Sequence, residues 1–177
     1  MTCIVGMVED GKVYIGGDSA VTAGNTVRAV KHPKVFRNGP FVIGCVGSVR
    51  MSQLLEYVLN VPPQGDDVTD KKYMITVFAE AVRTCLKEYG FAEVEDNKER
   101  FGTFLVGYHG GLYSVYSDLQ VTQYLDGMTA CGSGEEYALG ALYTLKGLDA
   151  EGRILVALAA ASYFDSNVAP PFAVMRT

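Results

Sequence analysis

The chain has no excess of basic residues, no long apolar run and no clustered cysteines. Its 177 residues carry a formal net charge of -5, which provides no basic footprint for nucleic acid or for an anionic membrane surface. The longest uninterrupted apolar run, Ile154 to Ala161, is far shorter than the roughly 20 residues that cross a bilayer. We therefore expect no nucleic-acid partner and no membrane partner.

Cysteine is scarce and scattered. The four cysteines lie far apart in apolar surroundings, which is typical of small buried hydrophobes rather than of a disulfide framework or a CxxC metal site; they are Cys3, Cys45, Cys85 and Cys131. The N-terminus also lacks a basic stretch followed by an apolar one, so no secretion signal is indicated. These absences favour a reducing, cytoplasmic location.

The signatures of metal and nucleotide sites are missing as well. His32 and His109 are the only histidines, and neither has the paired ligand spacing of a catalytic zinc. No GxGxxG or GxxxxGK motif occurs, so we expect no metal, no cofactor and no nucleotide on this chain. ATP, if it is used, would be consumed by a partner.

Apolar periodicity and turn signals predict one domain over residues 1–177. Asp10-Gly11 and Asn38-Gly39 mark two hairpins, and Asp70 to Tyr89 keeps a helical period throughout. Predicted strands cover residues 2–8, 12–18, 27–31, 34–37, 41–46, 101–108, 112–117, 120–125 and 172–175, and predicted helices begin near 48, 70, 132 and 151. This order favours the α+β class, with two packed antiparallel sheets and helices on both outer faces.

The second residue carries the strongest chemical signal. If Met1 is removed, which a small second residue such as Thr2 usually permits, the chain begins with a hydroxyl beside its own free α-amine. An α-amino group titrates at roughly 7.7 to 8.0, so it can accept the hydroxyl proton near neutral pH. Taken alone, Thr2 is more simply the second residue of an edge strand.

Several separated motifs favour a catalytic role for Thr2 over that simpler interpretation. Their order and spacing resemble those of proteasome β-type subunits, and most of all those of the bacterial HslV peptidase and related bacterial or phage homologues; the motifs are Thr2, Gly16-Gly17-Asp18, Gly24-Asn25-Thr26, Lys34-Val35, Gly47 and Gly132-Ser133-Gly134. The resemblance covers nearly the whole chain. It implies an N-terminal nucleophile hydrolase with an αββα sandwich, assembly into homo-oligomeric rings or stacked rings, and threonine-type proteolysis of unfolded polypeptides in an enclosed chamber. An ATP-dependent unfoldase is the implied partner.

The resemblance also assigns a catalytic role to each matching residue. Thr2 is the nucleophile, and Lys34 supports its alkoxide and is held by Asp18, although Lys31 lies near enough in sequence to compete. Gly47 supplies an oxyanion N–H, with Ser48 in place of the second glycine common in the family. The simpler interpretation is a turn for both Asp18 and Gly47.

Two further residues match the group that orients the amine. Ser133 would bond near the threonine amine, and Asp165 would help to orient it. Many family members have a serine three residues beyond that aspartate, where this chain has Val168, and Ser166 is displaced. The simpler interpretation of Ser133 is a helix N-cap.

Two other functions stay open. A chain that keeps Met1 would be an inactive proteasome-like ring subunit, because an amide nitrogen has no useful basicity. Alternatively, the same N-terminal chemistry could serve an amidase that acts on a small molecule. For the peptidase, the apolar residues beside Gly47 indicate an apolar preference before the scissile bond; they are Cys45, Val46 and Val49.

Overall fold

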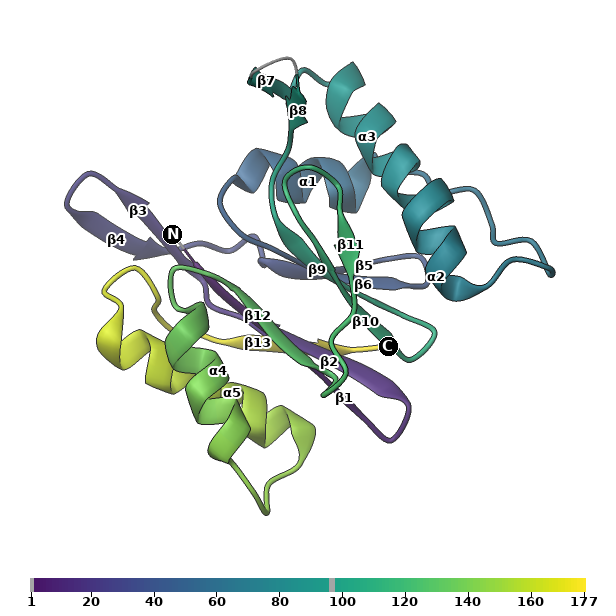
Figure 1. Ribbon diagram of the computed structural model, residues 1–177. Coiled ribbons are helices and arrows are strands. Elements are labelled where there is room, and N and C mark those ends of the chain that lie inside the picture. Colours follow the sequence, from purple (N-terminus) through teal and green to yellow (C-terminus); the bar gives the residue numbers. More distant parts are fainter. Residues whose placement is uncertain (1, 96–97) are drawn as a thin grey trace.

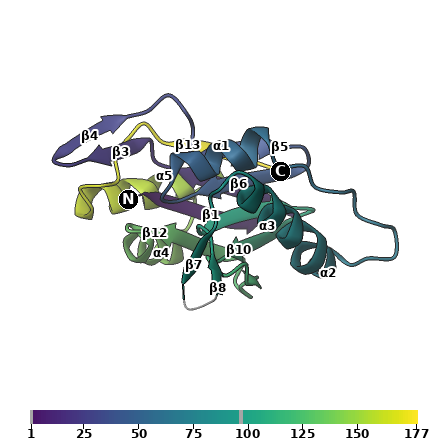
Figure 2. The ribbon, with the colours of Figure 1, turned by 90° about the horizontal axis from the view of Figure 1, so that it is seen from above.

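The computed structural model describes residues 2–95 and 98–177 of the chain. Two antiparallel sheets lie face to face, and helices cover both outer faces, so the molecule has four layers in the order α, β, β, α (Figures 1 and 2). The expected αββα sandwich is therefore confirmed.

The first sheet has the strand order β12-β1-β2-β13, and the second has the order β11-β10-β9-β6-β5. The strands of the first sheet are β1 (Cys3–Glu9), β2 (Lys12–Gly17), β12 (Met128–Gly132) and β13 (Ala173–Arg176). Those of the second are β5 (Val35–Asn38), β6 (Phe41–Cys45), β9 (Phe104–Tyr108), β10 (Gly111–Val115) and β11 (Val121–Thr122). Two separate hairpins are formed by β3 (Ala20–Ala23) with β4 (Thr26–Ala29) and by β7 (Glu93–Glu95) with β8 (Lys98–Arg100).

Each sheet has its own pair of covering helices. Helices α4 (Glu135–Thr144) and α5 (Ala150–Phe164) pack on the first sheet, while α1 (Val49–Tyr57) and α3 (Ala79–Glu88) cover the second (Figure 1). A short helix, α2 (Asp70–Tyr73), and a π-helical turn over Met74–Phe78 lead directly into α3. The long helix expected over 70–89 is thus present, with one wider turn inside it.

The apolar core is divided by the layers. Alternate residues of β1 point to opposite faces of the sheet, so Cys3 and Val5 pack with α4 and α5 whereas Ile4 packs between the two sheets. A third cluster fills the space between the second sheet and its helices and includes Phe36, Phe78 and Phe104. Strand β1 therefore contributes to two cores at once.

The Gly16-Gly17 pair at the end of β2 allows close packing on both faces. A Cβ on Gly16 would collide with Ile154 of α5, and one on Gly17 would lie 2.6 Å from Ile4 and 3.0 Å from Val35. Contacts below about 3 Å do not occur for real Cβ atoms, so any side chain here would push α5 or the second sheet away.

The structure corrects several predicted element bounds. Strand β12 was not predicted, because Met128–Gly132 lacks an alternating β-branched pattern; it forms by pairing with β1. The polar stretch after Ser19 contains β3, which pairs with β4 in an exposed hairpin. The strands predicted over 101–108 and 120–125 are shorter in the structure, at Phe104–Tyr108 and Val121–Thr122.

Within the described residues, no helix is long and apolar enough to cross a membrane.

Replacing Gly16 should test the tight packing of α5 on β2. We expect Gly16→Ala to lower the free energy of unfolding by about 1–3 kcal/mol, because Ile154 must move to make room. Urea denaturation measures the change. The control is Gly65→Ala, where the new Cβ has its nearest neighbour at 3.7 Å. Equal stability of the two variants would contradict the packing argument.

Candidate active site

Three strand ends bring Thr2, Asp18 and Lys34 together. Thr2 directly precedes β1 and Asp18 directly follows β2, and these ends are adjacent because the strands pair antiparallel with Ile4 opposite Gly17. Lys34 directly precedes β5 in the other sheet. The site therefore lies at one end of the sandwich and is built from both sheets.

The Lys34 ammonium forms the centre of this group. Its Nζ donates hydrogen bonds to Thr2 Oγ1 at 2.8 Å and to the two carboxylate oxygens of Asp18 at 3.0 and 2.9 Å. Asp18 also accepts the backbone N–H groups of Cys3 at 3.0 Å and of Ala20 at 2.9 Å. An ammonium has only hydrogens to offer, so Oγ1 of Thr2 is the acceptor in its bond with Lys34.

All three side chains are buried. Thr2 is 3% exposed, Asp18 is 1% exposed and Lys34 is 8% exposed. Burial lowers the pKa of Lys34, and the neighbouring Asp18 carboxylate acts in the opposite direction. Lys31 is exposed, so burial and hydrogen bonding both select Lys34 as the lysine of the site.

Gly47 and Ser48 join the second sheet to helix α1 beside this group. Gly47 has a φ of +84°, in the left-handed region that glycine adopts at low cost. Ser48 is the N-cap of α1, since its Oγ accepts the backbone N–H groups of Arg50 at 3.1 Å and Met51 at 3.4 Å. Gly47, Thr2 and Lys34 line one cavity of about 80 Å³. Gly47 is thus both a turn residue and a wall of the site.

Ser133 approaches the site from the end of β12. Its Oγ donates a long, 3.5 Å hydrogen bond to the backbone carbonyl of Thr2. The N-cap of α4 is Gly134, so Ser133 is not the cap that its sequence context suggested. Gly132 has a φ of +103°, and a Cβ there would collide with the Thr2 carbonyl. The backbone at position 132 therefore packs directly on the first residue of the site.

Asp165 is the C-cap of α5 and belongs to the same neighbourhood as Ser133. Its Oδ1 accepts hydrogen bonds from the backbone N–H and the side-chain amide of Asn167, both at 2.9 Å. Burial raises the pKa of Asp165, but interaction with the Ser133 hydroxyl and the bonds from Asn167 outweigh that effect, and the net pKa is lowered. Oδ2 is shielded from solvent and accepts no hydrogen bond from the described residues.

The cysteines next to the site are not candidate nucleophiles. Burial, with a further contribution from the Asp18 charge, raises the pKa of Cys3 to about 12, and burial also raises the pKa of Cys45. Across residues 2–95 and 98–177, no group of three or more His, Cys, Asp or Glu side chains is arranged to hold a metal ion.

Comparison with known proteins finds significant similarity only among solved structures. No protein-family model matches the sequence, and no curated protein is significantly similar to it. Among solved structures, BPH of Thiobacillus denitrificans superposes with a TM-score of 0.83 at 25% identity, covering 99% of this chain and 97% of that one. HslV of Trypanosoma brucei gives 0.69 at 22% identity, covering 99% and 98%. Anbu of Yersinia bercovieri gives 0.69 at 18% identity, covering 99% and 81%.

The chain has the fold of HslV-like, proteasome-type subunits. This confirms the resemblance inferred from the separated sequence motifs, and the match spans almost the whole chain.

Two departures from the common proteasome-type pattern have structural explanations. Ser48, in place of a second glycine, caps α1. Val168, in place of the serine beyond the aspartate, is buried among the side chains under α4 and α5. Asn167 provides the hydrogen bonds to Asp165, a role that sequence reasoning missed although an Asp followed two residues later by Asn is a typical turn signal.

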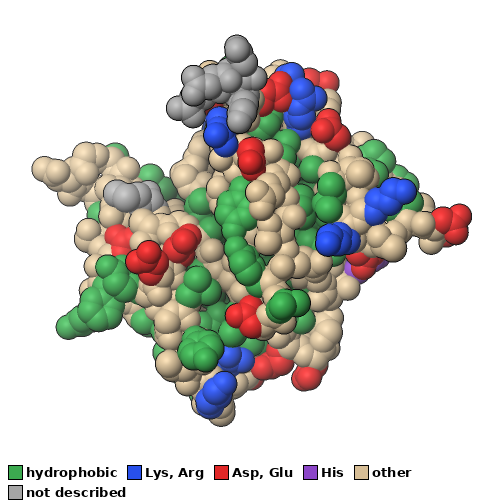
Figure 3. All heavy atoms as spheres, viewed as in Figure 1, with side chains coloured by type: hydrophobic (Ala, Val, Ile, Leu, Met, Phe, Trp, Pro, Cys, Tyr) green, Lys and Arg blue, Asp and Glu red, His purple; other side chains and the backbone are tan. Residues whose placement is uncertain are grey.

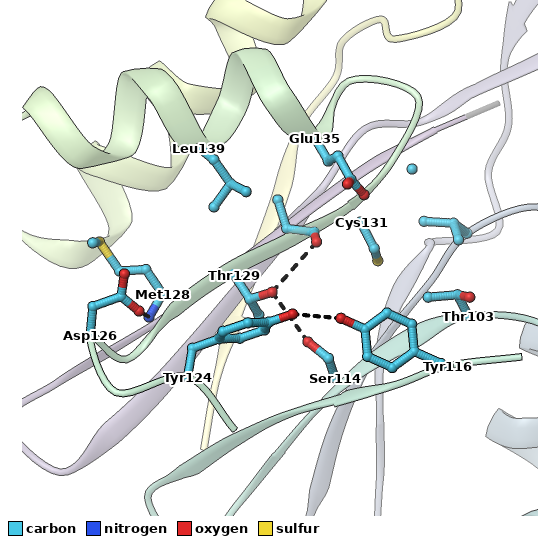
Figure 4. A pocket seen from close by; sticks show the side chains of 13 residues that line it. Thr103, Ser114, Tyr116, Tyr124, Asp126, Met128, Thr129, Cys131, Glu135 and Leu139 are labelled. Carbon is cyan, nitrogen blue, oxygen red and sulfur yellow. Dashed lines mark hydrogen bonds between the residues drawn. The ribbon is translucent and has the colours of Figure 1, made fainter. Parts of the chain in front are cut away.

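A larger hollow of about 590 Å³, also missed from the sequence, lies next to the group formed by Thr2, Asp18 and Lys34 (Figure 4). Val46 and Gly132 line this hollow. Val46 directly precedes Gly47 in the chain, and Gly132 packs against the Thr2 carbonyl. The hydroxyl groups of Tyr116 and Tyr124 point toward each other across the hollow, 2.5 Å apart, and this bond raises the pKa of Tyr116 to about 12. The hollow combines hydroxyl groups with apolar walls.

Removing the charge of Asp18 should destabilise the protein, because the Lys34 ammonium would lose its only carboxylate partner among the described residues. We expect Asp18→Asn to lower the free energy of unfolding at pH 7 by about 3 kcal/mol, as measured by urea denaturation. The control is Asp66→Asn, which removes an exposed carboxylate. A loss no larger than that of the control would show that the pair does not support the site.

Proposed function

We propose that this chain is a proteasome-type threonine peptidase in which removal of Met1 makes Thr2 the catalytic N-terminus. The 2.8 Å hydrogen bond between Lys34 Nζ and Thr2 Oγ1 carries the proposal. This bond places the buried, positively charged Lys34 ammonium next to the oxygen that must become nucleophilic. The fold shared with HslV-like subunits supports the same conclusion.

The proposed reaction proceeds through an ester. Oγ1 of Thr2 attacks the scissile carbonyl carbon while its proton passes to the α-amine of the same residue. The backbone N–H of Gly47 and the Lys34 ammonium stabilise the negative charge that develops. The C–N bond then breaks, the amine returns the proton to the leaving group, and water hydrolyses the ester to release the second product and restore Thr2.

Ser133 and Asp165 are proposed to orient the α-amine. Ser133 is hydrogen bonded to the Thr2 backbone, and the lowered pKa of Asp165 keeps its carboxylate ionised at neutral pH. Its solvent-shielded Oδ2 is the kind of acceptor that a nearby ammonium requires. Asn167 would act as a positioning residue by holding Oδ1.

We further propose that the chain works as a cytoplasmic ring or stacked rings, fed with unfolded polypeptides by an ATP-dependent unfoldase. Structural neighbours support multimeric assembly, since one solved structure is a helical assembly of the Anbu complex from Pseudomonas aeruginosa. A particle that keeps Met1 would instead be an inactive subunit, and an open monomer or dimer would favour an amidase with a small substrate.

The cavity beside Thr2 is narrow. Apart from Thr2, Lys34 and Gly47, its wall is formed by short side chains, including those of Ala20, Cys45, Val49 and Ser52. We propose that it receives the side chain before the scissile bond. At about 80 Å³ it suits a small apolar group such as that of Ala or Val.

The proposed nucleophile can be tested directly. Intact-mass measurement should show loss of one methionine and addition of one molecule of a peptide epoxyketone, the reagent class of the epoxomicin found in a solved complex of Thiobacillus denitrificans BPH. Thr2→Ala should abolish the adduct and lower peptidase activity by at least about 1,000-fold, whereas Thr26→Ala on exposed β4 should do neither. An unmodified protein that retains Met1 would favour the inactive subunit.

The proposed specificity can be tested with peptide substrates. Fluorogenic peptides with Ala or Val before the scissile bond should have a kcat/KM at least about 10-fold higher than the same peptides with Phe or Arg. Val49→Ala should enlarge the cavity and raise the relative rate for Phe. Faster cleavage after Arg or Phe by the unmodified protein would show that this cavity does not bind that side chain.

A further inference from the structure

The hollow lined by Tyr116 and Tyr124 takes no part in the proposed reaction. Its volume of about 590 Å³ is in the range of ligand pockets, whereas the cavity of about 80 Å³ beside Thr2 holds only a small group. Gly132 joins the hollow to the site, because a Cβ there would collide with the Thr2 carbonyl and would lie 3.2 Å from Val46. A polypeptide held at Thr2 can therefore extend into the hollow.

The two cavities lie on opposite sides of the segment that leads to Gly47. Cys45 lines the narrow cavity, and Val46, the next residue, lines the hollow. Consecutive side chains of an extended chain point to opposite sides, so the backbone before Gly47 separates the two spaces. In the proposed reaction the side chain before the scissile bond enters the narrow cavity, which leaves the hollow for another part of the substrate.

The proposed path of the proton indicates which part that is. The α-amine of Thr2 must return its proton to the leaving nitrogen, so the leaving half of the substrate departs past the Thr2 backbone. Ser133 is hydrogen bonded to that backbone, and Gly132 packs against it. Because Gly132 also lines the hollow, the leaving half departs on the side of the hollow.

The lining of the hollow is acidic. It includes the carboxylates of Glu135 in the first turn of α4 and of Asp126 in the turn before β12, and it includes no Lys, Arg or His of the described residues. Figure 3 shows acidic side chains gathered near the start of α4, and Figure 4 shows Glu135 projecting from that helix beside Cys131. Burial and the neighbouring Glu136 raise the pKa of Glu135, so a cation in the hollow would favour its ionised form.

The tyrosine pair adds hydrogen-bond acceptors and aromatic faces. The hydroxyl groups of Tyr116 and Tyr124 share one hydrogen bond, which leaves a lone pair free on each oxygen. Their rings also attract an ammonium or a guanidinium group through their π electrons. Carboxylates, hydroxyl oxygens and aromatic rings together suit a positively charged group on an apolar stem.

We propose that the hollow binds a Lys or Arg side chain on the half of the polypeptide that leaves after cleavage, with Glu135 as its anionic partner. Asp126 and Glu135 lie at opposite ends of β12, whose five residues span about 16 Å, so one side chain reaches only one of them. Glu135 is the nearer to Thr2, since it follows Gly132 by three residues. The inference rests on the proposed peptidase for the placement of the substrate.

Internally quenched peptides with Ala before the scissile bond test the proposal. Arg, norleucine or Glu is placed in turn at each of the first three positions after the bond. At one of these positions the unmodified protein should cleave the Arg peptide with a kcat/KM at least about 10-fold higher than the Glu peptide, with norleucine between them. Equal rates at all three positions, or a preference for Glu, would overturn the proposal.

Two neighbouring carboxylates provide a matched pair of variants. Glu135→Gln removes the charge with little change of shape and should lower the Arg-to-Glu ratio of kcat/KM by at least about 5-fold. Glu136→Gln removes an exposed carboxylate that does not line the hollow and should leave the ratio unchanged. The ratio does not depend on the amount of folded protein, so a purely structural role of Glu135 would not move it. Equal ratios in the two variants would contradict the assignment of Glu135.

A binding measurement distinguishes this inference from the proposed peptidase. In Thr2→Ala protein, a fluorescein-labelled hexapeptide with five Ala residues and one Arg should bind at least about 5-fold more tightly than its norleucine analogue, as measured by fluorescence anisotropy. Adding Glu135→Gln should remove that difference. If the unmodified protein cleaves no peptide but this difference is found, the proposed peptidase fails and the basic preference of the hollow stands. Cleavage without any preference for Arg overturns the inference alone.

Discussion

The buried ion pair of Lys34 and Asp18 is the interaction on which the candidate site depends. A buried ammonium is costly unless its hydrogens are bonded, and here Asp18 and Thr2 accept all three of the hydrogen bonds that an ammonium can donate. The same bonds join the two sheets at one end of the sandwich. The protein therefore uses one interaction both to close the end of the sandwich and to hold the positively charged Lys34 ammonium against the Thr2 hydroxyl.

The layered core explains how this group is held in place. Strand β1, which begins directly after Thr2, contributes alternate side chains to the cores on both of its faces. Gly16 and Gly17 then let α5 and the second sheet approach β2 without a side chain between them. A residue at the end of such a strand has little freedom to move, and the nucleophile that we propose at Thr2 requires this restriction.

Helix α5 connects the site to the outer surface of the molecule. It ends at Asp165, where the lowered pKa and the bonds from Asn167 create a fixed carboxylate near Ser133. The exposed rings of Tyr163 and Phe164 directly precede this carboxylate.

The sequence by itself determined the αββα layers, because apolar periodicity and turn pairs are local properties of the chain. The spacing of its separated motifs also singled out Thr2, Asp18 and Gly47. The sequence did not predict β12, since Met128–Gly132 becomes a strand only by pairing with β1. Only the tertiary structure decided between Lys31 and Lys34. It also showed that Ser48 caps α1 and that the N-cap of α4 is Gly134 and not Ser133. Burial and hydrogen-bond partners distinguish these residues, and both come from segments far apart in the sequence.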